Sequence, residues 1–206
     1  MGVHVTHGMS SSDSPVYRLD IQARCRKCDG CLRARAAYWR LAAINEMARA
    51  QRTWFGTLTL SPDIRFLVLS RARHRLAAQS IDYDTMTEDE RFTELVRETN
   101  PSITRYLKRV RKESGSQLRY LLVSEAHKDG MPHWHLLVHE VSQSEPVKKR
   151  TLQGQWKGGF SQFKLVAQGE SRPAFYVAKY LAKEARTRVR ASLEYGSPPE
   201  ALALQA

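Results

Sequence analysis

Two histidines and a glutamate in the middle of the chain have the spacing of a metal site, Glu125-x7-His133-Trp134-His135. Alternate residues of a strand point to the same face, so His133 and His135 would project together. Two imidazoles and one carboxylate suit a divalent ion such as Mn²⁺ or Mg²⁺, with positions left for a phosphate. Such an ion polarises a phosphodiester and offsets the charge that develops on cleavage. The alternative is that both histidines lie on the face of a sheet without binding a metal.

A second set of reactive side chains lies in residues 175–183, FYVAKYLAK. At 100° per residue, Tyr176, Lys179, Tyr180 and Lys183 share an arc of about 100°, and the apolar residues, Phe175 among them, would pack on a sheet. A tyrosine hydroxyl has an ordinary pKa near 10 and becomes a good nucleophile only when its anion is stabilised, as ammonium groups can do. The segment therefore predicts a helix with two candidate nucleophiles and two supporting cations. Two amphipathic tyrosines at a core margin are the alternative.

Three cysteines follow one another as Cys25-x2-Cys28-x2-Cys31. Their odd number excludes a complete disulfide framework. Three thiolates make a zinc site when a fourth ligand joins them, and His4, His7 or a cysteine of another chain are candidates for it. Free thiols at the start of a basic helix are an equally good interpretation.

The composition of the chain indicates one basic domain. Its 206 residues carry 33 Lys and Arg against 21 acids, a formal charge of +12, which favours a nucleic-acid partner over a generally basic protein. With 42% hydrophobic residues the chain can bury one core. No apolar run approaches the roughly 20 residues of a membrane helix, and no signal-peptide core is present. Together with the odd cysteine count, this favours a reducing, cytoplasmic setting.

Alternation and helical spacing predict the elements that position these groups. Helices are expected at 32–50, at 144–153, at 173–188 and over most of 64–116, with breaks near 82–87 and at Asn100-Pro101; strands are expected at 53–60, 118–125, 133–140 and 158–167. The turn HKDGMP makes the two middle strands a hairpin. This alternation predicts an α+β domain with a mainly antiparallel sheet. The domain is expected to span 21–190, between a flexible N-terminal arm (1–20) and a flexible tail (191–206).

The positions of other histidines, basic residues and tryptophans indicate further roles. His139 is expected as an exposed polar residue at its strand end, with an extra metal ligand as the alternative, and His127 lies in the turn without a role. Basic stretches at 24–40, 105–112 and 148–150 are candidate DNA contacts. The four tryptophans are possible base-stacking platforms, although most are expected in the core: Trp39, Trp54, Trp134 and Trp156.

Three segments in the order TWFGTLTL, E-x7-HWH and YVAKYLAK resemble the three motifs of the HUH replication initiators. Within that superfamily the chain is most similar to the initiators of small isometric single-stranded DNA phages, the microviruses of gokushovirus type. The segment CRKCDGCLRARAAYWRLAAINEMA also resembles the cysteine-containing segment of those proteins. The resemblance covers Cys25 to Lys183, which is most of the chain.

The resemblance implies an HUH endonuclease domain, which is ferredoxin- or RRM-like, with about five strands and flanking helices. It implies that His133, His135 and Glu125 bind the metal and that Tyr176 or Tyr180 attacks DNA, with Lys179 and Lys183 in support. The products are a 5′-phosphotyrosine and a 3′-OH for rolling-circle replication. Single-stranded or origin DNA, a host polymerase and a host helicase are the implied partners, in the cytoplasm of a bacterial host.

Two other functions fit parts of this pattern. A transposase of the HUH type would join DNA ends, but such enzymes commonly use one tyrosine. A non-catalytic RRM-like module would bind nucleic acid with the same sheet and charge, and it would need neither the metal ligands nor the tyrosine pair.

Overall fold

The computed structural model describes residues 3–5, 21–23, 25, 27–141, 146–183 and 187–197. The elements are β1 (Val3–Val5), β2 (Ile21–Ala23), α1 (Asp29–Arg49), β3 (Arg52–Leu60), α2 (Pro62–Ala77), the 3-10 turn η1 (Tyr83–Thr85), α3 (Glu88–Ser114), β4 (Leu118–Ala126), β5 (Pro132–Glu140), α4 (Lys149–Gly154), β6 (Gly159–Leu165), α5 (Arg172–Lys183) and β7 (Arg188–Ala191). Strands β1 and β2 pair with each other, and the other five form one sheet in the order β6-β3-β5-β4-β7.

The main sheet has the topology of a ferredoxin- or RRM-like domain. Every neighbouring pair of its strands is antiparallel. Helices α2 and α3 connect β3 to β4, and α4 connects β5 to β6, so the β-α-β-β-α-β unit is complete. Strand β7 adds to the edge next to β4. The predicted α+β class and the five-stranded antiparallel sheet with flanking helices are therefore confirmed.

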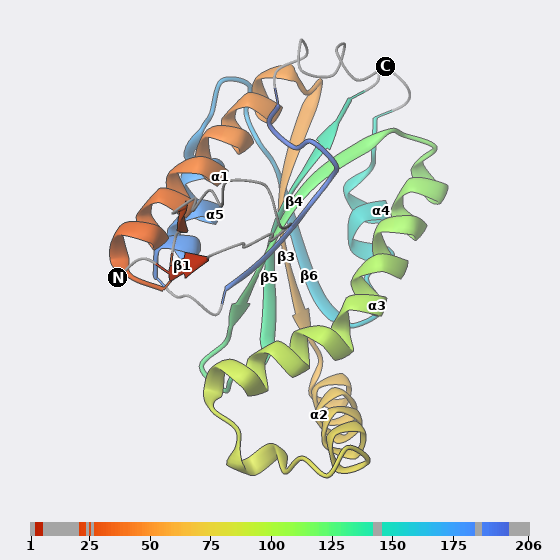
Figure 1. Cartoon of the computed structure of the whole chain (residues 1–206). Coiled ribbons are helices and arrows are strands. Elements are labelled where there is room, and N and C mark those ends of the chain that lie inside the picture. The colour runs from red at the N-terminus through yellow and green to blue at the C-terminus, as the bar shows by residue number, and fades with distance from the viewer. Residues whose placement is uncertain are drawn as a thin grey trace, which may run out of the picture.

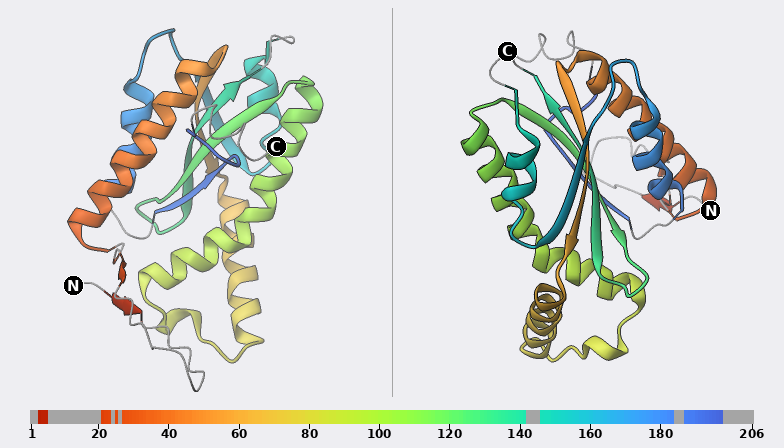
Figure 2. Two further views of the ribbon diagram at one scale, coloured as in Figure 1. Left: turned by 45° about the horizontal axis from the view of Figure 1, so that its top comes forward. Right: turned by 180° about the vertical axis from the view of Figure 1, so that it is seen from behind.

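Helices cover both faces of this sheet (Figure 1). Helices α3 and α4 lie on one face, where Trp134, Leu136 and Val138 of β5 point into the larger core. Helix α2 lies beyond the end of β3 and packs against α3. Helices α1 and α5 lie side by side on the other face, as the view from behind also shows (Figure 2), and pack on Leu121 and Leu137. Along β5, His133 and His135 alternate with these core residues, so their side chains point to the opposite face, towards α5.

The tight turn between β4 and β5 follows from its sequence. Gly130 adopts a left-handed φ of 78°, which side chains disfavour. Its amide donates to the His127 carbonyl, and the Met131 amide donates to the Asp129 carboxylate at 3.0 Å. The predicted hairpin is thus closed by the Asp-Gly pair on which it was based.

Helix α3 corrects the expected break at Asn100-Pro101, because it continues through Pro101. Proline removes one helical hydrogen bond, but the apolar stripe of the helix continues from Leu95 to Ile103 and Tyr106, all buried. The helix begins with a capping box formed by Thr87 and Glu90 and ends at Gly115 with a φ of 64°. Burial of this stripe outweighs the local penalty of the proline.

The C-terminal part of the domain also differs from expectation. Residues from Arg188 on were assigned to a helix end and a tail, but Arg188–Ala191 form β7, and Tyr195 is 4% exposed in the core beside Ala42. Packing on the core of the described residues therefore continues to Tyr195. Residues 198–206, most of the arm and the side chains of His4 and His7 lie outside the described residues.

Candidate active site

The register of the sheet places the predicted ligands in two neighbouring rows, which together we call the carboxylate–histidine row. Glu125 of β4 lies directly opposite His133 of β5, and His133 lies opposite Thr59 of β3. One row along, His135 lies opposite Thr57. Directly opposite residues of antiparallel strands share a face, so these side chains all project towards α5.

Each histidine of the pair faces a threonine hydroxyl. The Nδ1 atom of His133 is 2.9 Å from Thr59 Oγ1, and Nδ1 of His135 is 3.4 Å from Thr57 Oγ1. These contacts leave the Nε2 atoms for other ligands, and Nε2 of His135 lies 3.3 Å from a Glu125 oxygen. Hydrogen bonds of this kind orient metal-binding imidazoles. The two threonines of TLTL thus have a positioning role that sequence reasoning missed.

The chemistry of this donor set fits a divalent ion. Burial lowers the pKa of His133, and burial together with its neighbour His133 lowers that of His135 to about 3. Both rings are therefore neutral near pH 7, which is the form that binds metals. The ligand atoms of Glu125, His133 and His135 do not all lie within 4.8 Å of one another. Binding one ion through all three requires a side-chain rotation.

The tyrosine helix lies against the histidine pair. Ala174, Val177 and Leu181 of α5 are buried on the sheet, which places the tyrosines over β5. The Tyr180 ring stacks on that of His135, with centroids 4.5 Å apart and an interplanar angle of 8°. The Tyr176 ring meets the same imidazole edge-on at 5.4 Å. One histidine thus contacts both candidate nucleophiles.

The two tyrosines differ in environment. Tyr176 is 43% exposed, whereas Tyr180 is half-buried. Burial raises the pKa of Tyr180, and a hydrogen bond with Tyr176 raises it further. Lys179 and Lys183 are exposed on the same helix. Tyr176 is therefore the phenol with freer access to a ligand.

Phe175 is a correction within this helix. It was expected to pack on the sheet, but it is 49% exposed. The guanidinium of Arg40 on α1 lies over its ring at 5.0 Å from the centroid. Phe175 lies at the edge of the apolar side of α5, so its ring contacts α1 and not the sheet.

His139 is the second correction, because it is fully buried and not exposed. Its Nδ1 lies 2.9 Å from Thr53 Oγ1, and its Nε2 lies 2.7 Å from the Tyr195 hydroxyl. Both ring nitrogens are therefore occupied, which argues against the extra-ligand alternative. Nothing in the tail sequence marked Tyr195 as its partner.

The turn beside the site carries one further contact that sequence reasoning missed. The His127 ring lies 6.3 Å from that of His133, and its Nδ1 is 3.2 Å from an Asp129 oxygen. Asp129 also pairs with Arg65 at the start of α2. The end of the hairpin is thus attached to α2 through the ion pair of Asp129 with Arg65.

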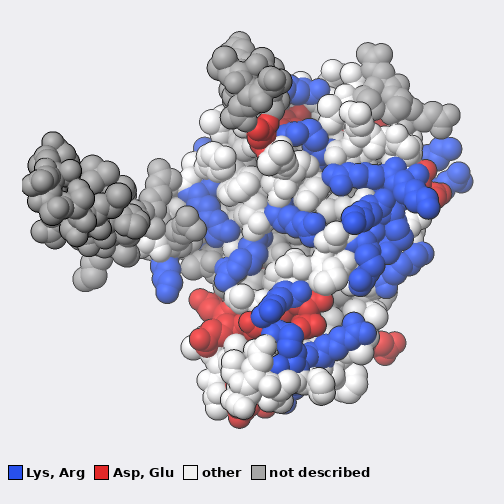
Figure 3. Space-filling view, turned by 45° about the vertical axis from the view of Figure 1, so that its right-hand side comes forward, with Lys and Arg blue, Asp and Glu red and all other residues white. Residues whose placement is uncertain are grey.

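Exposed cations gather on the side of the molecule that carries α3 and α4 (Figure 3). They are Arg105, Lys108, Arg111, Lys112, Lys148, Lys149 and Arg150. These belong to the predicted basic stretches, and they lie on the face of the sheet opposite the tyrosines. Phosphates would be attracted there whatever their sequence.

Few of the predicted stacking platforms are accessible. Trp54, Trp134 and Trp156 are buried, as expected for most of them, and Trp39 is partly buried. Phe160 of the edge strand β6 is instead 68% exposed and lies opposite Thr59, on the face of the histidine row. A lone aromatic in an alternating strand gave no signal in the sequence.

The three cysteines come together at the start of α1. Their sulfur atoms all lie within 4.8 Å of one another, and among the described residues no other trio of potential metal ligands is grouped so tightly. The cluster could bind a metal.

Every helix in the described ranges is too short or too polar to span a bilayer.

Fold and site together define an RRM-like α+β domain with a carboxylate–histidine row beside a tyrosine helix. Residues 53–185, more than half of the chain, match the family model of the replication-associated protein ORF2/G2P. The chain belongs to this family of replication-associated proteins, which gives it a role in DNA replication and in nucleic-acid binding. The match runs from β3 through α5 and begins after the cysteines and α1. No curated protein and no solved structure shows significant similarity to the chain.

Proposed function

We propose that the protein is a metal-dependent DNA nickase of the HUH type that initiates rolling-circle replication through a tyrosine nucleophile. The observation that carries the proposal is the contact of His135 with both Tyr176 and Tyr180. It joins a histidine of the candidate ligand row to the two phenols, although more than 40 residues separate them in the chain. A family of replication-associated proteins is the setting in which such chemistry is used.

The chemistry follows from the residues around the phenols. The Tyr176 oxygen attacks the phosphorus of a phosphodiester, and the bond from phosphorus to the 3′-oxygen breaks. The phenol proton is lost and the 3′-oxygen gains one, so the products are a 5′-phosphotyrosine and a 3′-OH. Lys179 and Lys183 stabilise the phenolate and the phosphate. A divalent ion such as Mn²⁺ or Mg²⁺, held by Glu125, His133 and His135, would supply Lewis-acid polarisation of the phosphate.

We assign the first attack to Tyr176 and the second to Tyr180. Tyr176 is the more exposed phenol, while the raised pKa of Tyr180 keeps its proton in place. After one round of synthesis Tyr180 can attack the regenerated junction, and the 3′-OH can then attack the phosphotyrosine to close a circle. Strand transfer and ligation therefore use the same pair of residues.

The proposed biological setting is the replication of a small single-stranded DNA phage of the microvirus type. The 3′-OH is a primer for a host polymerase, and strand separation is assigned to a host helicase, in the cytoplasm of a bacterial host.

The thiol cluster has no part in this reaction. We assign to it a zinc ion with a structural role.

The test is covalent capture of labelled single-stranded circular DNA with Mn²⁺ on a denaturing gel. We expect an adduct with the native chain and with Tyr38→Phe, a matched control at an exposed tyrosine of α1. Tyr176→Phe should lower first-turn adduct formation at least 100-fold, Tyr180→Phe should spare it but block circle release, and the double variant should form none. An undiminished adduct in the double variant would refute the proposal.

A second variant tests the metal assignment. His133→Ala should abolish nicking while salt-sensitive DNA binding persists. Nicking at the native rate would exclude this residue as a ligand. DNA binding without any adduct in the native chain would indicate a non-catalytic RRM-like module, and joining of DNA ends without primed synthesis would indicate a transposase.

A further inference from the structure

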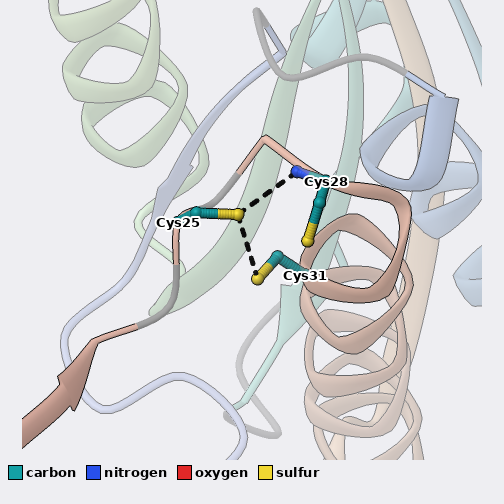
Figure 4. A group of neighbouring side chains, drawn as sticks. All are labelled: Cys25, Cys28 and Cys31. Carbon is teal, nitrogen blue, oxygen red and sulfur yellow. Dashed lines mark hydrogen bonds between the residues drawn. The ribbon is translucent and has the colours of Figure 1, made fainter. Parts of the chain in front are cut away.

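The cysteine cluster is distant in sequence from the nicking residues and has its own geometry. The sulfur atoms of Cys25 and Cys31 are 3.6 Å apart, and the backbone amide of Cys28 donates to the Cys25 sulfur at 3.4 Å. The three side chains point towards one another at the first turn of α1 (Figure 4). Cys28 is the N-cap residue of that helix, and its side chain makes no capping hydrogen bond.

The spacing of the sulfur atoms distinguishes between the structures that three cysteines can form. A disulfide requires sulfur atoms about 2.05 Å apart, and all three cysteines are free. Sulfur ligands of one tetrahedral zinc, at about 2.3 Å from the metal, are about 3.8 Å from each other. In a [4Fe–4S] cluster each cysteine binds a different iron, so the cysteine sulfur atoms are farther apart, and in a [2Fe–2S] cluster no more than two cysteines share one iron. Separations below 4.8 Å therefore match a single ion.

We propose that the thiolates of Cys25, Cys28 and Cys31 bind one zinc ion, and that a ligand outside this trio fills the fourth position. Thiolates are soft ligands that select zinc, whereas the carboxylate–histidine row suits Mn²⁺ or Mg²⁺. The protein thus has two metal sites of different selectivity. This inference concerns a separate site and does not depend on the nicking chemistry.

The start of α1 favours the thiolate form that binds zinc. Cys28 is the N-cap residue of α1, and Cys31 lies in its first turn. Both sulfur atoms therefore belong to the end of the helix whose dipole stabilises anions.

The position of the site gives the ion a structural task. It joins the residues after β2 to the first turn of α1, and α1 packs along α5, the tyrosine helix. Arg35 of α1 donates to the Thr187 carbonyl at 2.8 Å, beyond the end of α5. The zinc ion therefore fixes the start of the helix against which the tyrosine helix rests.

The experiment is metal analysis of the purified full chain by mass spectrometry. We expect one zinc per chain in the native protein and in His133→Ala, and an at least tenfold loss in Cys25→Ser, Cys28→Ser and Cys31→Ser variants whose circular dichroism is native. Titration of the metal-free native chain with Co²⁺ should give sulfur-to-cobalt charge-transfer absorption and tetrahedral bands, a readout that requires no variant.

Several results would overturn the inference. They are a folded native chain without zinc, zinc retained by all three serine variants, fewer than three sulfur ligands in X-ray absorption, or the visible spectrum of an iron–sulfur cluster. Metal content is measured without DNA, so its outcome is separate from that of the adduct assay. Loss of adducts with one zinc retained would refute only the nickase.

Discussion

The buried His139 should make the stability of the fold depend on pH. Burial of the ring lowers its pKa to about 4, against 6.5 for the free side chain. The negative charge of Glu46 opposes this shift, and the positive charges of Arg119 and Arg49 add to it. Between these values only the unfolded chain binds the proton, so stability falls as the pH falls from 6.5 to about 4. Since each pH unit in this interval is worth about 1.4 kcal/mol, the loss amounts to about 3 kcal/mol.

The assay is urea unfolding, followed by tryptophan fluorescence, of the native chain and His139→Gln between pH 7 and pH 4. Glutamine can still bond the hydroxyls of Thr53 and Tyr195 but does not titrate, so the native chain should lose about 3 kcal/mol more than the variant on acidification. His74→Gln is the matched control, because it makes the same replacement at an exposed position of α2. Parallel pH curves for the native chain and His139→Gln would show that His139 does not titrate as argued.

Three further substitutions test packing, capping and DNA contact. A Cβ at Gly56 would lie 2.2 Å from the Phe163 ring, so Gly56→Ala should lower the unfolding free energy by about 1 to 3 kcal/mol, and an unchanged urea midpoint would contradict the packing. Thr87→Ala removes the capping box of α3 and should cost about 1 kcal/mol in the same assay, whereas no loss would mean that the cap is not formed in solution. Phe160→Ala should weaken binding of a single-stranded oligonucleotide roughly tenfold at constant salt without shifting the urea midpoint, and equal affinity would exclude base stacking there.

The elements that carry the site could be predicted because their signals are local. The β-rich composition of 118–125 and 133–140 and the Asp-Gly turn between them predict a hairpin, and the hairpin brings Glu125 opposite His133. The spacing of Ala174, Val177 and Leu181 fixes which side of α5 meets the sheet. The contact of α5 with His135 is a long-range outcome, for which the resemblance to a known family was the stronger guide.

The features that were missed depend on partners far away in the chain. His139 is surrounded by Thr53 of β3 and Tyr195 of the C-terminal segment, and neither position has a pattern that predicts the contact. Pro101 was expected to end a helix because local propensity disfavours it, but tertiary burial of both flanks decided the outcome. Strand β7 has four residues and lies at the sheet edge, too short for alternation to be seen.

The chemistry of one face of the sheet is determined by packing on the other. A slip of β5 by one residue would turn His133 and His135 into the larger core and would move Trp134 and Leu136, which are at most 1% exposed, to the less tightly packed face beside the tyrosines. Burial of such side chains is worth roughly 1.5 to 3 kcal/mol each, more than the threonine–histidine hydrogen bonds. The hydrophobic core beneath α3 and α4 therefore selects the register, and the register places the histidines beside Glu125 and the tyrosines. The sequence HWHLLVHE specifies both faces at once, because the same alternation that fills the core leaves the imidazoles facing α5.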